Sequence, residues 1–179
     1  MHFEKTKIKE CIIFVNSELK DKRGKFSKFY SKEISDHLSN NLQIKEVFMS
    51  SSQKNVIRGM HFQTPPYDQD KLVTCIKGSV LDVFLDIRKK SKTFAQYDTL
   101  QLSEDDNYIL FLPKGIAHGF KSLENDTELL YMVTSNYSGE NDTGIHYNSF
   151  GFNWESENPI LSERDLSFSH LKKFKTPFL

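Results

Sequence analysis

A succession of short, evenly spaced apolar segments constrains the fold of this chain more than any other feature of its sequence. Turn-forming residues such as Lys77-Gly78 and Pro113-Lys114-Gly115 separate them. Short strands at this spacing, with little helix between them, are typical of a β-sandwich or a barrel. The predicted strands cover residues 56–62, 71–77, 79–87, 96–102, 108–112, 117–123 and 127–135.

The flanking regions are more polar but still show regular patterns. Ile34 and Leu38 lie one helical turn apart and predict a short helix over residues 32–41. A C-terminal helix is expected to start within Ile160–Asp165, with Ser162 as its N-cap. Further strands are predicted over residues 11–15, 25–30 and 44–49.

We expect a single domain over residues 1–179. Its N-terminal strands and helix cover residues 1–50, its barrel core covers 51–137, and a C-terminal segment covers 138–179. A chain of this length can bury a substantial core.

Composition limits the classes of partner and compartment. The 24 basic and 24 acidic residues balance, which gives no indication of a nucleic-acid or membrane partner. The first residues lack the apolar region of a signal peptide, and no apolar run approaches a membrane span. A cytoplasmic protein is therefore expected, with Cys11 and Cys75 as buried, reduced thiols because both lie in apolar segments.

Side chains that can do chemistry gather in the segment Val56–Leu72, which contains Arg58, His61, Gln63 and Lys71. In a regular strand, Arg58 would face the opposite side from His61 and Gln63. Gly59 is a candidate for a bulge that re-aims them. From this segment alone, His61 is as readily a hydrogen-bonded core residue as a catalytic base.

The spacing Pro113-x-Gly115-x-x-His118 matches the second motif of cupins, which are small β-barrels of the jelly-roll type. A metal-binding cupin also carries His-x-His in its first motif, and here that position is His61-Phe62-Gln63. Two histidines without a thiolate or carboxylate do not complete a usual metal site. No bound metal is therefore expected.

Other candidate residues have ordinary structural interpretations when taken alone. Tyr131 lies in an apolar strand, where tyrosine is usually a core residue. Asp165 lies near a helix start, where an acidic residue favours the helix dipole. Asp82 and Asp86 alternate with apolar residues and give their strand one polar face, which could line a cavity.

Taken together, the motifs form an ordered series that resembles the dTDP-4-dehydrorhamnose 3,5-epimerase family. The series runs from Arg23-Gly24 to the end of Ile160–Asp165 and covers nearly the whole chain. The resemblance implies an all-β, cupin-type jelly-roll barrel with short peripheral helices. It also implies a homodimer that needs neither a metal nor a redox cofactor.

The resemblance implies roles as well. His61 matches the family's base, Asp165 its partner, Tyr131 the catalytic tyrosine and Lys71 the lysine beside the sugar's keto oxygen. The expected substrate contacts are Arg23, Phe26, Arg58, Gln63 and His118, with Arg23 and Phe26 reaching the partner subunit's site. These residue types suit epimerisation, because a 4-ketone acidifies the C–H bonds at C3 and C5 and a neutral imidazole can remove such a proton.

Three positions depart from the family pattern where the family recognises its nucleotide. Glu46-Val47-Phe48 replaces Gln-x-Asn, Lys28 replaces a glutamate, and Asp68-Gln69-Asp70 replaces Ala-Gln-Gly. We therefore expect the reaction to be kept, in bacterial surface-polysaccharide synthesis, on either dTDP-4-keto-6-deoxyglucose or another nucleotide sugar such as a GDP-4-keto-heptose. Inversion at C3 alone and at both carbons are both open.

Two other functions remain open from the sequence. One is a nucleotide-sugar 3,4-ketoisomerase, and the other is a non-catalytic sugar-binding cupin. Tyr131 and the Arg58-Gly-x-His61 pattern argue against the ketoisomerase. Retention of His61, Tyr131 and Asp165 together argues against the sugar-binding cupin.

Overall fold

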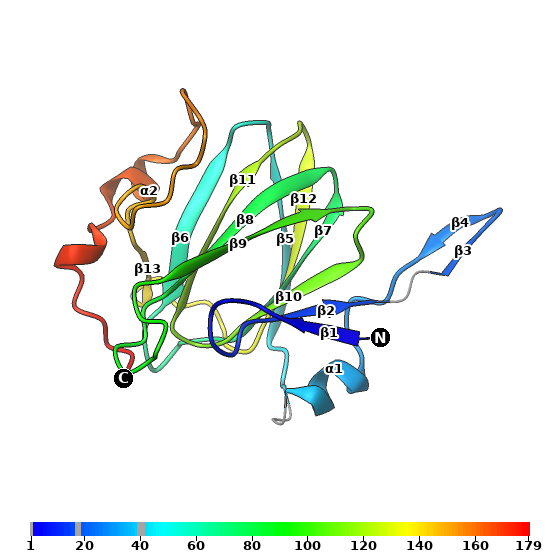
Figure 1. The fold of residues 1–179 in the computed structure, drawn as a ribbon, viewed down its shortest axis with the longest axis horizontal. Coiled ribbons are helices and arrows are strands. Elements are labelled where there is room, and N and C mark those ends of the chain that lie inside the picture. The colour runs from blue at the N-terminus through cyan, green and yellow to red at the C-terminus, as the bar shows by residue number, and fades with distance from the viewer. Residues whose placement is uncertain (1, 17–18, 39–41) are drawn as a thin grey trace.

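Two antiparallel β-sheets pack face to face in the computed structural model, which describes residues 2–16, 19–38 and 42–179 (Figure 1). The six-stranded sheet has the order β1 (His2–Lys5), β2 (Ile12–Val15), β10 (Tyr108–Leu112), β7 (Lys71–Lys77), β12 (Thr127–Val133), β5 (Glu46–Ser52). The five-stranded sheet has the order β13 (Asp142–Gly144), β6 (Ile57–Gln63), β11 (Ile116–Ser122), β8 (Ser79–Asp86), β9 (Tyr97–Ser103).

From β5 onward the chain crosses between the two sheets at almost every strand, as the strand orders show. Such crossing is the connectivity of a jelly roll. The predicted all-β, cupin-type jelly-roll barrel is confirmed.

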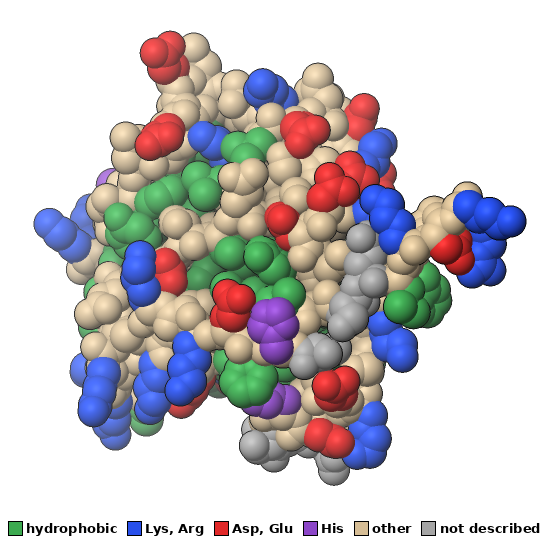
Figure 2. Space-filling view, turned by 45° about the vertical axis from the view of Figure 1, so that its right-hand side comes forward, with side chains coloured by type: hydrophobic (Ala, Val, Ile, Leu, Met, Phe, Trp, Pro, Cys, Tyr) green, Lys and Arg blue, Asp and Glu red, His purple; other side chains and the backbone are tan. Residues whose placement is uncertain are grey.

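The remaining elements are small and lie outside the two sheets. A hairpin of β3 (Leu19–Asp21) and β4 (Gly24–Phe26) projects from the body, with basic side chains at its tip (Figures 1 and 2). The helices are α1 (Lys32–His37), α2 (Glu163–Ser167) and the 3₁₀ turn η1 (Leu171–Lys173). No helix in the described part of the chain is long and apolar enough to cross a membrane.

The ends of most predicted strands lie within two residues of the observed ends, and the strands predicted over 71–77 and 108–112 have the observed bounds. The strand predicted over 25–30 is wrong beyond Phe26, because the pairing of β4 with β3 ends there. The strand predicted over 44–49 corresponds to β5, which begins two residues later, at Glu46, and continues to Ser52 because the serines at its end pair with β12.

The helical predictions agree in place but not in length. The helix predicted over 32–41 ends at His37, and residues 39–41 lie outside the described residues. The Ser162 N-cap is confirmed, because its hydroxyl accepts a hydrogen bond from the Asp165 N–H at 3.1 Å. The short strands β1, β3 and β13 were not predicted.

Apolar side chains pack in three layers. Between the sheets lie residues such as Val73, Phe84 and Phe120. Helix α1 covers the outer face of the six-stranded sheet through Ile34. The C-terminal segment covers the outer face of the five-stranded sheet, where Trp154 is buried. This last layer brings the C-terminal segment against β6.

Both cysteines are buried and free, as predicted. Burial raises the pKa of the Cys75 thiol to about 12, so the thiol stays protonated at neutral pH.

Gly59 allows strand β6 to approach β11 more closely than a side chain would permit. Its φ is +138°, and a Cβ there would lie 2.5 Å from the Gly119 Cα. His61 pairs with His118 and Arg58 with Phe120, so three steps on β6 match two on β11. This two-against-one count is a β-bulge, and it confirms the predicted irregularity at Gly59.

We expect Gly59→Ala to lower the free energy of unfolding by about 2 kcal/mol or more, because the methyl group meets the backbone of β11. Gly24→Ala is the matched control, since Gly24 has a φ of +123° with no atom within 4 Å of the added Cβ. Urea denaturation of both variants measures the difference. Equal destabilisation by the two substitutions would contradict the close approach.

Candidate active site

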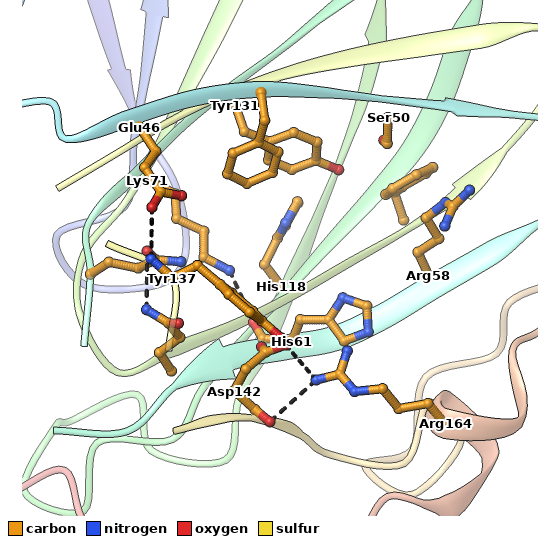
Figure 3. A pocket seen from close by; sticks show the side chains of 14 residues that line it. Glu46, Ser50, Arg58, His61, Lys71, His118, Tyr131, Tyr137, Asp142 and Arg164 are labelled. Carbon is orange, nitrogen blue, oxygen red and sulfur yellow. Dashed lines mark hydrogen bonds and ion pairs between the residues drawn. The ribbon is translucent and has the colours of Figure 1, made fainter. Parts of the chain in front are cut away.

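A pocket of about 280 Å³ gathers six of the nine residues predicted from the sequence. They come from both sheets, and their side chains point into a common space (Figure 3). Because of the bulge at Gly59, Arg58 and His61 both reach this pocket although they are three residues apart on one strand. The six are Arg58, His61, Gln63, Lys71, His118 and Tyr131.

His61 forms a hydrogen-bonded pair with Asp165. The distance from His61 Nε2 to Asp165 Oδ1 is 2.8 Å, and Asp165 Oδ2 accepts the Gly59 N–H at 3.1 Å. Burial favours a raised pKa for Asp165, but its contacts with His61 and Gly59 outweigh this and lower the pKa below its usual value. Asp165 is therefore ionised and holds a proton on His61 Nε2, which leaves Nδ1 able to accept one.

Lys71 begins strand β7 and is buried beside His61. Its ammonium group donates to the His61 carbonyl at 3.1 Å. Burial lowers the pKa of Lys71 to about 8, although the charges of Asp142 and Asp82 oppose this. Lys71 is therefore mostly a cation at neutral pH and loses its charge in the mildly alkaline range.

Tyr131 lies on β12 and its ring stacks on Phe48 of the neighbouring strand β5, with ring centroids 5.0 Å apart. Burial raises the pKa of Tyr131 above its ordinary value. The hydroxyl is therefore protonated at neutral pH and can serve as a proton donor.

The Asp82 carboxylate holds His118 by a hydrogen bond, with 2.8 Å between His118 Nε2 and Asp82 Oδ2. Of the polar face predicted on β8, only Asp82 thus contacts a pocket residue. Asp86 instead binds Arg88 and the hydroxyls of Ser91 and Thr93. Neither aspartate lines the pocket, so the predicted polar face of β8 does not form part of its wall.

Gln63 and Arg58 both form hydrogen bonds with backbone groups at the pocket. Gln63 Nε2 donates to the Tyr67 carbonyl at 2.8 Å and its oxygen accepts the Ser138 N–H at 2.7 Å. Arg58 donates to the Ser51 carbonyl at 3.1 Å. Gln63 thereby holds two loops together at the pocket wall.

Arg23 and Phe26 do not reach this chain's own pocket. They lie on the projecting hairpin, where Arg23 pairs with Asp21 at 2.6 Å and the Phe26 side chain is exposed. Their predicted role in a partner's site requires a second copy of the chain.

The sequence reasoning assigned no site role to five residues that line the pocket: Ser50, Phe120, Tyr137, Asp142 and Arg164. Arg164 Nη2 lies 2.7 Å from Asp142 Oδ2, and this pair borders the pocket beside His61 (Figure 3). Arg164 directly precedes Asp165 in the sequence, so its position beside a predicted site residue could have identified it. Asp142 lies in a polar stretch that gave no signal.

The positions that depart from the family pattern divide into two groups. Glu46, Phe48 and Gln69 line the pocket, and Glu46 Oε1 accepts the Tyr137 N–H at 2.8 Å. Asp68 and Asp70 instead contact Lys114, and Lys28 is exposed outside the pocket. Only the first group can contact a ligand in this pocket.

Within the described residues, no group of three or more histidine, cysteine, aspartate and glutamate side chains is arranged to hold a metal ion. The histidines of the pocket are each paired with one carboxylate instead.

Comparison with known proteins identifies the family. The family model for dTDP-4-dehydrorhamnose 3,5-epimerase matches residues 5–173. The dTDP-4-dehydrorhamnose 3,5-epimerase of Shigella flexneri is 35% identical over 170 residues, covering 93% of this chain and 94% of the relative. The enzyme of the same name from Escherichia coli K12 is 37% identical over 169 residues, covering 92% and 91%.

Solved structures agree with this assignment. The dTDP-6-deoxy-D-glucose-3,5-epimerase of Legionella pneumophila, in complex with dTDP-4-keto-L-rhamnose, superposes with a TM-score of 0.93 at 32% identity and covers 99% of both chains. The dTDP-4-dehydrorhamnose 3,5-epimerase of Sulfolobus tokodaii gives 0.91 at 34% identity over 100% of both chains. This chain therefore belongs to the dTDP-4-dehydrorhamnose 3,5-epimerase family, as its ordered motifs predicted.

Proposed function

We propose that this protein is an isomerase that inverts one or both carbons flanking the 4-keto group of a dTDP-linked 6-deoxy sugar. The observation that carries the proposal is the gathering of the His61–Asp165 pair, Lys71 and Tyr131 around one pocket. The names of the relatives favour dTDP over GDP, since each of those compared is a dTDP-sugar enzyme.

The pocket supplies each proton step of such a reaction. His61 takes the proton from the carbon beside the ketone, and ionised Asp165 stabilises the imidazolium that forms. Negative charge moves to the keto oxygen, where the Lys71 ammonium group stabilises the enolate. Tyr131 returns a proton to the other face of the carbon, and solvent then reprotonates the tyrosinate and takes the proton from His61.

The alternative functions explain the pocket less well. A sugar-binding cupin does not need a histidine held by a buried carboxylate, which costs stability. A 3,4-ketoisomerase also moves protons next to a ketone, but it has no need of a donor on the opposite face such as Tyr131.

A homodimer is part of this proposal. The projecting hairpin exposes Leu19, Phe26 and Arg23, and large apolar side chains exposed on an arm of this kind suit contact with another copy. In such a dimer the N-terminal segment forms the contact and Arg23 supplies positive charge for a diphosphate. The cytoplasmic location and the role in surface-polysaccharide synthesis stay predictions from the sequence.

We expect His61→Asn to lower the rate of deuterium uptake from solvent at C3 and C5 by about 100-fold or more, because the base is lost. NMR of dTDP-4-keto-6-deoxyglucose incubated with the enzyme in D₂O measures the uptake. His170→Asn serves as the control, since His170 is an exposed histidine that is not among the residues lining the pocket. Normal uptake with His61→Asn would show that His61 is not the base.

We expect kcat/KM to fall as pH rises through about 8, because Lys71 is active as a cation and its pKa in the free enzyme is about 8. Below that pH the charge is present. In Lys71→Met, the residual activity should show no such alkaline decrease. A pH profile of both proteins tests this, and an unchanged decrease in the variant would assign it to another group.

We expect dTDP to raise the melting temperature more than GDP, UDP or CDP at equal concentration, because a ligand that binds only the folded state stabilises it. A thermal-shift series with the four nucleotides measures this. A larger shift with GDP would redirect the proposal to a GDP-linked sugar, and no shift with any of the four would argue against a nucleotide-sugar substrate.

A further inference from the structure

Asp82 is a fully buried carboxylate whose hydrogen bonds are only half satisfied by the protein. Its Oδ2 contacts His118 Nε2 at 2.8 Å, whereas its buried Oδ1 has no hydrogen-bond partner among the described residues. Burying an ionised carboxylate is costly unless nearby charge compensates it. Such a residue calls for an explanation beyond packing.

The backbone places this carboxylate behind the proposed reaction site. Asp82 pairs in register with Phe120, and His118 lies two residues from Phe120 on β11, so Asp82 and His118 are diagonal neighbours across the two strands. His118 in turn pairs in register with His61. Two histidines therefore stand side by side, each with Nε2 held by a different buried carboxylate.

Because Asp82 occupies Nε2 of His118, the other ring nitrogen, Nδ1, stays available to a ligand in the pocket. A proton on Nε2 is required for the bond to an ionised Asp82. Nδ1 has no hydrogen-bond partner in the described part of the chain. The ring borders the pocket and lies in an edge-to-face arrangement with the Tyr131 ring, at a centroid distance of 6.0 Å. His118 thus lies between the proposed base and the proposed donor (Figure 3).

The negative charge of Asp82 also acts on the two other groups of the site. It raises the pKa of Lys71 against the lowering effect of burial, together with the charge of Asp142. It adds to the effect of burial in raising the pKa of Tyr131. Both effects favour the protonation states that the proposed reaction needs.

We propose that Asp82 is a positioning residue of this site, which orients His118 toward the substrate. The inference rests on the proposed function, and it goes beyond that function by assigning a role to a residue that does not line the pocket. Asp82 donates nothing to the substrate itself. It acts through His118, which it holds by Nε2.

The test is the isosteric substitution Asp82→Asn, which removes the charge and keeps the size. We expect kcat to fall about 10- to 100-fold, by analogy with the carboxylates that orient metal-bound histidines, with little change in KM. The alkaline decrease of kcat/KM should move to lower pH, because Lys71 loses a supporting charge. NMR of ¹³C-lysine-labelled protein, with Lys71→Met to assign the signal, should show a lower pKa for Lys71.

Asp98→Asn is the matched control, since Asp98 lies on the neighbouring strand β9 and pairs with Lys7 outside the pocket. It should leave the rate, the pH profile and the Lys71 titration unchanged. If Asp82→Asn lowers the melting temperature but leaves kcat and the pH profile unchanged, Asp82 is only structural and the proposal is wrong.

NMR of the histidine side chains needs no turnover, so failure of the proposed function is distinguishable from failure of this inference. If Asp82→Asn does not fold, ¹⁵N NMR of histidines in the unmodified protein should show the His118 proton on Nε2. A bare Nε2 would overturn the proposed orientation.

Discussion

The candidate active-site pocket depends on the two hydrogen bonds of the Asp165 carboxylate. One oxygen binds His61, 104 residues earlier in the chain, and the other binds the Gly59 N–H within the bulge of β6. These bonds join the C-terminal segment to the strand that carries the proposed base. They require the C-terminal segment to pack on the outer face of the five-stranded sheet, so the site is completed by tertiary structure rather than by local sequence.

Burial of charge is the second constraint on this molecule. Asp165, Asp82, His118 and Lys71 are all nearly inaccessible, and each buried charge costs stability unless it is paired. The protein offsets this cost by pairing His61 with Asp165 and His118 with Asp82. It also places Lys71 near the negative charges of Asp142 and Asp82. Violations of the apolar-interior rule are expected at functional sites, and these four residues lie in or beside one pocket, whereas the buried charges of Asp86 and Lys121 lie elsewhere.

Much of the barrel could be predicted because its signal is local. Apolar segments bounded by turn residues gave the strands over 71–77 and 108–112, and a glycine in the middle of β6 gave the bulge. The strands β1, β3 and β13 were not predicted because they are three or four residues long and partly or wholly exposed. Their sequences therefore show no strong alternation of apolar and polar residues.

The site was harder to predict than the fold, for a physical reason. Residue chemistry alone gave Tyr131 and Asp165 ordinary structural roles, and only the family resemblance joined them to His61. The Asp142–Arg164 pair depends on two segments that meet only in the folded chain. Asp86 looked equivalent to Asp82 in the strand pattern, yet its neighbours Arg88, Ser91 and Thr93 engage it away from the pocket.

The buried Lys71 has a consequence for the pH dependence of folding. In the unfolded chain this lysine holds its proton up to about 10.5, whereas in the folded protein it releases the proton near 8. Between these values the unfolded state binds more protons, so this residue makes the folded state more stable as pH rises. Catalysis through the same ammonium group weakens over that range. The pH at which the contribution of Lys71 to folding is most favourable is therefore one at which the enzyme has lost the charge it is proposed to use.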